Sequence, residues 1–514
     1  MIDFEIIHTG NRAIFWTDME SSRFLLKDEA VPGHSYQNDL NKYLAASRNV
    51  FKGSHRLHFP YTVKHGQDLK IIVFPGRPSW FAAKGDILLM MDMITLGATY
   101  TKLEQCALNR IQLDLLLTIL HTKGLMRPPD QQPADRAPDQ FFRCDDIMLL
   151  EATRRCNLTC KHCFNNSEFA LPNENSLDEL KNHIDYLISR KIGNNLVISG
   201  GEPLTRKDIF LLIAYAFEKG LSIELLTNGL IINEDILARL KYFNVKVRVS
   251  LDGFSAVTHE FLRGPGTFTK TVENIIRLVQ SGITTGITTS FSAHNIHEVD
   301  LLENSIERTN VDFFQYIIMN QLGRAIPNNI VNSDDSLLFM KLHEILSRNS
   351  RVRYAMRNST LANIIAGNHL GLYFNHCGVG LQTNFYVQSD GDIFPCRAMI
   401  QPEFKIGNLK NGNDLDEAKF AALRSLEVDS LNPICAACSF RYWCSGECRG
   451  ENYLITGSLT SPTTYCDELI DGFTTCLFLT AKDPELYYGK SSSFLARAGR
   501  SDLITDYLTS VYAS

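Results

Sequence analysis

Three cysteines lie close together in the stretch EATRRCNLTCKHCFNNS, residues 151–167. Cys156, Cys160 and Cys163 are separated by three and two residues. Thiolates at such spacing bind zinc or iron–sulfur clusters, and most of these sites use four ligands. Three thiolates can instead hold three irons of a [4Fe–4S] cluster and leave the fourth iron open to an exogenous ligand. A zinc knuckle would need a further ligand in the loop, for which His162 is a candidate.

A second polar motif, GGEP at residues 200–203, follows the next apolar run of the chain. Gly200 and Gly201 allow the backbone to approach a ligand closely, and Glu202 can pair with an ammonium group. A zinc knuckle gives no reason for these residues. The pattern therefore favours a cluster that binds a small molecule over a structural zinc site.

The three-cysteine loop followed by the GGEP motif resembles the radical S-adenosylmethionine (SAM) superfamily. The resemblance implies that the amino and carboxylate groups of SAM occupy the open iron. It also implies that one electron from the cluster cleaves SAM to methionine and a 5'-deoxyadenosyl radical, which abstracts hydrogen from the substrate. The missing fourth cysteine would then be the binding site for SAM.

The resemblance implies a set of residues that meet SAM. The SAM ammonium group would meet Gly200, Gly201 and Glu202. The ribose would meet Ser250 and Asp252, and the carboxylate would meet Arg263. An alternative interpretation of Arg263 is a solvated charge after a helix. The residue before the third cysteine is usually aromatic in the family, and here it is His162. This departure leaves the stacking contact to adenine open, and no catalytic base is identified.

A second set of cysteines lies in a turn-rich region of about 90 residues near the C-terminus. Its spacing resembles the SPASM extension of radical SAM enzymes, which implies two auxiliary [4Fe–4S] clusters and therefore three clusters in all. The outer cluster would be held by Cys435, Cys438, Cys444 and Cys466, and the inner cluster by Cys377, Cys396 and Cys448. The fourth iron of the inner cluster would be open to substrate or held by a remaining cysteine such as Cys144 or Cys476. A zinc site with leftover cysteines is the alternative.

The elements that must position these motifs are short β-rich runs that alternate with helical segments over residues 147–320. This alternation predicts an α/β fold with a parallel sheet, a partial (β/α)6 barrel. Because the motifs follow successive strands, they meet at the carboxyl ends of the sheet, where such barrels place their active sites. The expected domains are 1–125 (winged-helix-like), 126–140 (linker), 145–330 (barrel), 331–370 (helical bridge), 371–470 (SPASM) and 471–514 (helical tail).

The N-terminal region combines alternating apolar residues with three helical patterns between residues 85 and 125. It resembles the small winged-helix domains that recognise the leaders of ribosomally made peptides. Such domains add an extended peptide to a sheet edge beside a helix. The predicted edge is KIIVF, residues 70–74, next to the helix containing Leu113 to Leu120. Nucleic acid is not expected as a partner because the region has no dense basic stripe.

Composition limits the remaining possibilities. The chain of 514 residues has 51 basic and 57 acidic side chains, a net charge of -6, so the overall balance does not point to nucleic acid or anionic lipid. The N-terminus does not read as a signal peptide, and the most apolar stretch is too short to cross a bilayer, so we expect a cytoplasmic protein without a membrane partner. Thirteen cysteines in such a protein indicate metal ligation rather than disulfides.

The expected function is that of a radical SAM/SPASM peptide maturase. It would bind a precursor peptide with a leader, receive electrons from a flavodoxin- or ferredoxin-type reductant, and form a C–C or C–S (thioether) crosslink. One alternative is a sulfatase-maturating type of enzyme that makes formylglycine. Those enzymes carry an aspartate after the second cysteine of the extension, where this chain has Arg397. A zinc-binding scaffold for peptide or DNA is the other alternative.

Overall fold

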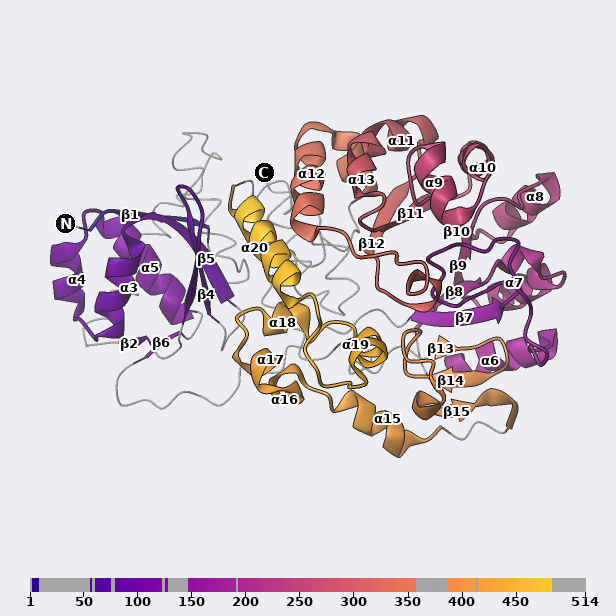
Figure 1. Ribbon diagram of the computed structural model, residues 1–514. Helices are drawn as coiled ribbons and strands as arrows, with labels where there is room; N and C mark the ends of the chain where they lie inside the picture. The colour runs from indigo at the N-terminus through magenta and orange to yellow at the C-terminus, as the bar shows by residue number, and fades with distance from the viewer. Residues whose placement is uncertain are drawn as a thin grey trace.

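The computed structural model describes residues 2–8, 56–57, 61–74, 79–122, 125–127, 147–190, 193–356, 377, 386–411 and 415–482. Figure 1 shows an N-terminal module at one end, the barrel at the other, and the C-terminal cysteine region with its long helix α20 between them. None of the described helices is long and apolar enough to cross a lipid bilayer.

The barrel is built on six parallel strands that follow one another in the sheet in chain order. They are β7 (Ile147–Thr153), β8 (Asn195–Gly200), β9 (Ser222–Thr227), β10 (Lys246–Ser250), β11 (Thr285–Phe291) and β12 (Phe313–Ile318). The helices are α6 (Leu177–Ser189), α7 (Ile209–Glu218), α8 (Glu234–Tyr242), α9 (Ala256–Arg263), α10 (Phe268–Gln280) and α11 (Leu302–Thr309). The predicted partial barrel is confirmed.

Helix α6 shows how local sequence sets these elements. Ser176 Oγ accepts a hydrogen bond from the backbone N–H of Glu179, and the Glu179 carboxylate accepts one from the backbone N–H of Ser176 at 2.7 Å. This reciprocal cap satisfies two amides that have no partner within the helix. Leu180, Ile184 and Leu187 recur at helical spacing and are buried against the sheet. The cap fixes where the helix begins, and the apolar stripe fixes which face packs inward.

The C-terminal cysteine region extends the barrel sheet. Strand β13 (Tyr386–Val387) pairs in parallel with β7, and β14 (Asp392–Phe394) and β15 (Gly407–Asn408) continue the sheet antiparallel. The bridge before it contains α12 (Asp335–Arg348) and α13 (Ser350–Ala355), and the expected helix over 357–370 lies outside the described residues. The helices that follow are α15 (Glu417–Arg424), α16 (Val428–Leu431), α17 (Pro433–Ala437), α18 (Arg441–Cys444), α19 (Arg449–Thr456) and α20 (Cys466–Lys482). Residues 483–514 of the expected tail also lie outside the described residues.

Short 3-10 helices complete the barrel and cysteine regions. They are η2 (Pro203–Thr205), η3 (Ile296–Leu301), η4 (Gly323–Ala325), η5 (Pro402–Phe404) and η6 (Leu409–Asn411).

The N-terminal module pairs an antiparallel sheet with three helices. The sheet order is β1 (Phe4–His8), β5 (Ser79–Gly85), β4 (Lys70–Phe74) and β3 (Thr62–His65). The helices are α3 (Ile87–Thr95), α4 (Tyr100–Cys106) and α5 (Arg110–Thr122), and β2 (Arg56–Leu57) pairs with β6 (Met126–Arg127). The expected linker therefore begins with a strand, and its remainder, 128–140, lies outside the described residues.

Strand β4 corrects one prediction. KIIVF was expected to be a sheet edge, but β4 pairs with β3 on one side and with β5 on the other. Its side chains alternate between two cores: Ile72 and Phe74 pack with the three helices, whereas Ile71 and Val73 pack with α18 and α20 of the cysteine region. A strand buried on both faces reads as a continuous apolar run, so the sequence did not reveal its interior place.

Candidate active site

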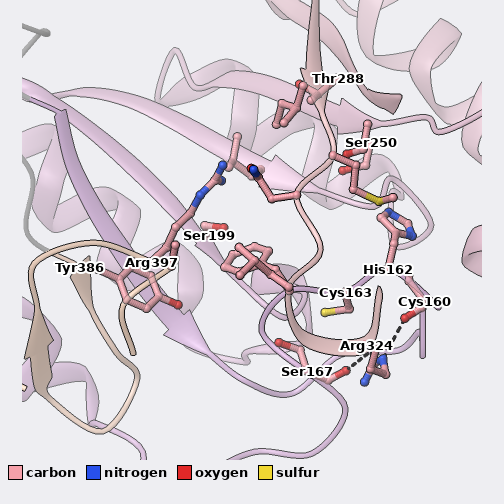
Figure 2. Close-up of a pocket in the computed structure, with 18 of the residues that line it drawn as sticks. Cys160, His162, Cys163, Ser167, Ser199, Ser250, Thr288, Arg324, Tyr386 and Arg397 are labelled. Carbon is pink, nitrogen blue, oxygen red and sulfur yellow. Dashed lines mark hydrogen bonds between the residues drawn. The ribbon is translucent and has the colours of Figure 1, made fainter. Parts of the chain in front are cut away.

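One cavity of about 660 Å³ lies at the carboxyl ends of the barrel strands, between the barrel and the C-terminal cysteine region. Figure 2 shows Cys160, His162 and Cys163 on one side of this cavity and Tyr386 and Arg397 on the other. Both sets of cysteines contribute to its wall, through Cys156, Cys160, Cys163, Cys377, Cys396, Cys444 and Cys448. The cavity is therefore the place where the chemistry of both sets can meet.

Gly200 and Gly201 hold the end of β8 against the start of the cysteine loop. A Cβ on Gly200 would lie 2.3 Å from the carbonyl oxygen of Thr153, and a Cβ on Gly201 would lie 2.3 Å from that of Arg155. Gly200 also has a φ of +139°, which other residues rarely adopt. Both glycines line the cavity, but the closest approach they permit is between two backbones of this chain. Glycine is required here because any side chain would displace the cysteine loop.

Glu202 is fully buried behind the cavity wall. Its carboxylate accepts hydrogen bonds from the Thr227 hydroxyl at 2.9 Å, from the backbone N–H of Asn228 at 2.7 Å and from that of Leu204 at 3.1 Å. Burial raises the pKa of Glu202 to about 7, although these donors oppose the rise. The structure thus shows Glu202 tying the ends of β8 and β9 together, and its contact with the SAM ammonium group stays a prediction.

Asp252 is the centre of a buried group of charges. One oxygen accepts from Arg263 Nε at 2.5 Å and lies 2.9 Å from His162 Nε2, and the other accepts from the backbone N–H of Ser290 at 2.8 Å. Burial alone would raise the pKa of Asp252, but the charges of Arg263 and His162 hold it below its usual range. Ser250 lines the cavity, as do His162 and Arg263, whereas Asp252 is fully buried. The histidine that departs from the family pattern is therefore paired with Asp252, and the proposed contacts of these residues with SAM stay predictions.

Arg324 braces the cysteine loop, and sequence reasoning missed it. Its guanidinium donates to the carbonyl oxygens of Cys160 at 2.8 Å and of Ser167 at 3.1 Å (Figure 2). Its backbone N–H donates to the carbonyl oxygen of Cys163 at 3.0 Å. The preceding Gly323 has a φ of +54°, and a Cβ there would lie 2.4 Å from the same Cys163 oxygen. The glycine was the one available signal, because an arginine 164 residues after Cys160 shows no local pattern.

Glu151 links the loop to the C-terminal region and was also missed. This fully buried residue of β7 accepts hydrogen bonds from Asn165 at 2.9 Å and from the backbone N–H of Ser389 at 3.2 Å. It also accepts one from the hydroxyl of Tyr386, whose pKa is raised by burial and by the charge of Glu151. A single carboxylate inside the apolar run IMLLEAT was the available signal, since a buried charge needs partners.

The thiols of the second set fall into two groups in space. In the first, Cys448 interacts electrostatically with Cys396, which in turn interacts with Cys377. Burial raises the pKa of Cys396 to about 11 and that of Cys448 to about 12. In the second group, the thiols of Cys444 and Cys466 both interact with Cys438, and Cys466 also interacts with Cys435. These are the residues assigned to the inner and outer clusters, and their role as ligands stays a prediction.

Cys476 does not complete the inner group. It is 3% exposed and lies in the large apolar core of the barrel, and it does not line the cavity. Burial raises its pKa, and Asp335 is the one charged group that adds to the rise. It was suggested as a ligand because it was a remaining cysteine, but α20 places it in the barrel core near Asp335 of α12. Cys144, the other suggested ligand, lies outside the described residues.

The donors around the cavity fit the cofactors that the sequence implies. Within the described residues no three His, Cys, Asp or Glu side chains converge on a single metal ion. In a four-iron cluster each thiolate binds a different iron, so its ligands need not converge on one point. Arg449 is 2% exposed and lines the cavity, and its Nε and Nη2 are buried without a hydrogen-bond partner in the described part of the chain. Such N–H groups suit the sulfides of an anionic cluster beside Cys448.

Arg397 occupies the place where sulfatase-maturating enzymes are expected to carry an aspartate. It is exposed in the cavity wall, and its guanidinium lies 5.2 Å from the ring centroid of Phe164. An arginine cannot accept a proton at any pH near neutrality. The side chain at this position can therefore hold an anion or stack on a ring, but it cannot act as a base.

Comparisons with known proteins agree with this geometry. Residues 150–304 match the model of the radical SAM superfamily, and residues 377–439 match that of SPASM, an iron-sulfur cluster-binding domain. An AdoMet-dependent heme synthase of Methanosarcina barkeri is 27% identical over 341 residues, 62% of this chain and 95% of that protein. A mycofactocin maturase MftC of Mycolicibacterium smegmatis is 27% identical over 347 residues, 66% of this chain and 87% of that protein.

Two solved structures show the same fold. Native anSMEcpe with bound AdoMet and Cp18Cys peptide is 19% identical, with a TM-score of 0.53 over 66% of this chain and 97% of that chain. Streptococcus suis SuiB bound to S-adenosylmethionine is 15% identical, with a TM-score of 0.52 over 80% of this chain and 99% of that chain. Together with the cysteine loop and the parallel sheet, the two domain matches show that this chain is an enzyme of the radical SAM superfamily that carries a SPASM domain.

Proposed function

We propose that the protein modifies a ribosomally made precursor peptide, forming a C–C or C–S (thioether) crosslink. The observation that carries this proposal is the shared cavity, where the three-cysteine loop faces the inner cysteine group across a volume of about 660 Å³. When SAM and the [4Fe–4S] cluster are bound, they supply a 5'-deoxyadenosyl radical that abstracts hydrogen from the substrate. The likeness to a mycofactocin maturase, and to a solved anSMEcpe that holds a peptide, supports a peptide as that substrate.

The chain's own residues orient the reactants. Arg324 and Glu151 hold the cysteine loop in one conformation, so that Cys156, Cys160 and Cys163 present their thiols to the cavity. Gly200 and Gly201 keep the end of β8 close to the start of the cysteine loop, and the pairing with Asp252 holds the Arg263 guanidinium at the cavity wall. The SPASM domain closes the opposite side of the cavity and limits the entry of water.

The N-terminal module is proposed to bind the leader of the precursor peptide. In the described part of its sheet, β1 and β3 each pair on one side only. An extended leader would add to one of these strands, and β3 lies toward the SPASM domain, since Thr62 donates to Ser439 Oγ at 2.9 Å. A leader on β3 would therefore be delivered close to the domain that covers the cavity.

Three [4Fe–4S] clusters are proposed, one in the barrel and two in the SPASM domain. The support is the division of ten cysteines into sets of three, three and four in space. An auxiliary cluster would accept the surplus electron after ring closure, and a flavodoxin- or ferredoxin-type protein would supply the first one. The cell compartment proposed is the cytoplasm, where thiols stay reduced.

Tetrapyrrole modification is a second candidate function. It is favoured by the heme synthase from Methanosarcina barkeri, which this chain matches over 95% of that protein. Formylglycine formation, as in sulfatase maturation, is less well supported because Arg397 cannot take the proton that an aspartate would take there.

The test is product analysis with the anaerobically reconstituted enzyme, SAM and a reductant. The substrates compared are the peptide encoded by a short reading frame next to the gene and iron-coproporphyrin. A peptide product lighter by about two hydrogens, with a crosslink located by fragmentation, supports the proposal. The same mass loss at a serine without ring closure would indicate formylglycine chemistry, as would the loss of two hydrogens with exchange of sulfur for oxygen at a cysteine. Turnover of the tetrapyrrole but not of the peptide would contradict the proposal.

A further inference from the structure

The inner cysteine group offers three thiols, one fewer than a fully ligated four-iron cluster uses. Cys377, Cys396 and Cys448 line the cavity, and Cys476 is buried in the barrel core. Cys444 also lines the cavity, but its thiol interacts with Cys466 and Cys438 of the outer group. Within the described residues, the inner group therefore has no fourth thiol, and another kind of ligand is needed if the cluster is closed.

Glu447 is the candidate for this fourth ligand. It directly precedes Cys448, lines the same cavity, and its charge acts on the thiols of both Cys448 and Cys444. No other acidic side chain lines the described part of this cavity. Carboxylate oxygen is a well-established ligand for iron, so the residue type suits the position.

The backbone between the two cysteines is held in an unusual conformation that places Glu447. Ser445, Gly446 and Glu447 have successive φ values of +54°, +78° and +61°. A non-glycine residue rarely adopts this region and persists there only where its surroundings enforce it. The turn is enforced by backbone hydrogen bonds from Ser445 to Arg441 at 2.7 Å and from Glu447 to Cys444 at 2.9 Å.

The charge of Glu447 is not neutralised by the described part of the chain. No side-chain hydrogen bond or ion pair joins it to a cation there, and its strongest electrostatic neighbours are the acids Glu451 and Asp335, ahead of Arg449. Glu451, by contrast, accepts hydrogen bonds from Tyr465 at 2.7 Å and from Asn320 at 2.6 Å. Glu447 is half-buried at the cavity wall, and a carboxylate whose nearest charges are other acids is stabilised by a cation, which an iron beside Cys448 would supply.

We propose that the carboxylate of Glu447 is the fourth protein ligand of the inner auxiliary [4Fe–4S] cluster. The inference rests on the proposed function only in that it requires an iron–sulfur cluster on Cys377, Cys396 and Cys448. The carboxylate binds one iron through an oxygen atom. This closes the inner cluster to substrate, so the peptide radical passes its electron to the cluster without binding to iron.

The test uses full-length protein in which Cys156, Cys160 and Cys163 are replaced by alanine, so that only the SPASM clusters form. In this background Glu447→Gln is compared with Glu447→Cys and with the matched control Glu451→Gln. Each protein is reconstituted with iron and sulfide, oxidised mildly, and measured for iron content and for the electron paramagnetic resonance signal of a [3Fe–4S] cluster. We expect Glu447→Gln to lose about one of about eight irons and to show the signal. Glu447→Cys and Glu451→Gln should retain the iron and show no signal.

Two results would overturn the inference. The first is a Glu447→Gln protein with the same iron content and the same spectrum as its parent. The second is a [3Fe–4S] signal of equal size in the parent, which would mean that the fourth iron has no protein ligand. Zinc in place of iron in all four proteins would overturn the cluster assignment in the proposed function itself, so that failure is distinguishable from the other two.

Discussion

The two walls of the cavity differ in whether their charged side chains form ion pairs. On the barrel side, Arg263 and His162 share Asp252, and Arg248 pairs with Glu224 at 2.5 Å. On the SPASM side, Glu447 and Arg397 make no ion pair within the described residues, and Arg449 keeps two N–H groups without partners. The charged side chains named on the barrel wall are thus paired within the chain, whereas those named on the SPASM wall have no ion pair within the described residues.

This difference indicates what each wall is for. A wall whose charges are paired keeps its shape whether or not a ligand is present, which suits a site that must orient SAM before each turnover. A wall with open charges gains its stability from the group that binds there. The stability of the barrel side should therefore depend on its ion pairs, and the stability of the SPASM side should depend on its cofactors.

The largest expected effect comes from removing the thiols of the barrel side. Replacing Cys156, Cys160 and Cys163 by alanine should reduce SAM cleavage by at least ~10³-fold and remove about four irons per chain, because the cluster loses all its protein ligands. Cleavage is measured as 5'-deoxyadenosine formed. Cys106→Ala, in α4 of the N-terminal module, is the control and should change neither quantity. Cleavage that persists in the triple variant would mean that this loop does not hold the cluster.

Next comes the buried charge group of the barrel wall. Asp252→Asn leaves the charge of Arg263 unpaired in the interior, which should lower the free energy of unfolding by about 3–5 kcal/mol. The control is Asp235→Asn, which breaks the exposed pair between Asp235 and Arg239 and should cost less than about 0.5 kcal/mol. Urea unfolding followed by circular dichroism measures both. Equal losses in the two variants would show that the barrel wall is no more dependent on its pairs than the surface is.

A smaller effect is expected from the acids behind the SPASM wall. Burial, with the charges of Asp334 and Glu468, raises the pKa of Asp335 to about 7 from its usual 3.8. Because the folded state holds the proton more tightly than the unfolded state, this residue lowers stability as pH rises from about 4 to about 7. Asp335→Asn should therefore be more stable than the parent at pH 8, by about 1–3 kcal/mol, and equal to it at pH 4.

The pH comparison has its own control. Glu202 and Glu447 also have a pKa raised to about 7 and are ionised over the same range, so Asp335→Asn reduces the pH dependence of unfolding without abolishing it. Asp334→Asn, at the N-cap of α12, keeps an oxygen that accepts from the backbone N–H of Leu337 and removes one charge that raises the pKa of Asp335, so it should gain a smaller amount of stability at pH 8. If Asp335→Asn does not gain stability over the parent as pH rises, the site does not disfavour the ionised form of Asp335.

The smallest effect on stability is expected at the open arginine of the SPASM wall. Arg397→Gln should change the free energy of unfolding by less than about 0.5 kcal/mol, since the side chain has no ion pair to lose within the described residues. Urea unfolding of the reconstituted protein measures it. A loss of more than about 2 kcal/mol would mean that Arg397 is paired as the barrel arginines are, and the contrast between the walls would then fail.

The sequence predicted local features of the fold closely. Strands β7 to β12 lie within residues 147–320, where β-rich runs alternate with helical segments, and α3, α4 and α5 lie within residues 85–125, where helical spacing was seen. The sequence also showed that ten cysteines fall into two regions of the chain, and their assignment to clusters stays a prediction. These features are short-range: apolar periodicity decides an element, and residues that bind one cluster are often close in sequence.

Other features depend on partners far away in the chain. Spacing did not show that β13 would pair with β7 and join the two domains in one sheet, or that β4 would lie between β3 and β5. It also did not show that Asp252 would pair with His162 and Arg263. Strand order is set by which apolar faces can be buried together, and periodicity carries no record of that choice.

What the sequence determined by itself was therefore the set of reactive side chains available: three thiols in one loop, seven in a later region, and the glycines that follow the loop. What the tertiary structure decided was which charges are paired and which remain open. An ion pair forms between groups that packing brings together. A carboxylate can therefore be paired with a cation, as Asp252 is, or have no ion pair within the described residues, as Glu447 has none. The physical reason is that burial and neighbouring charge, both properties of the folded chain, set the state of an ionisable group.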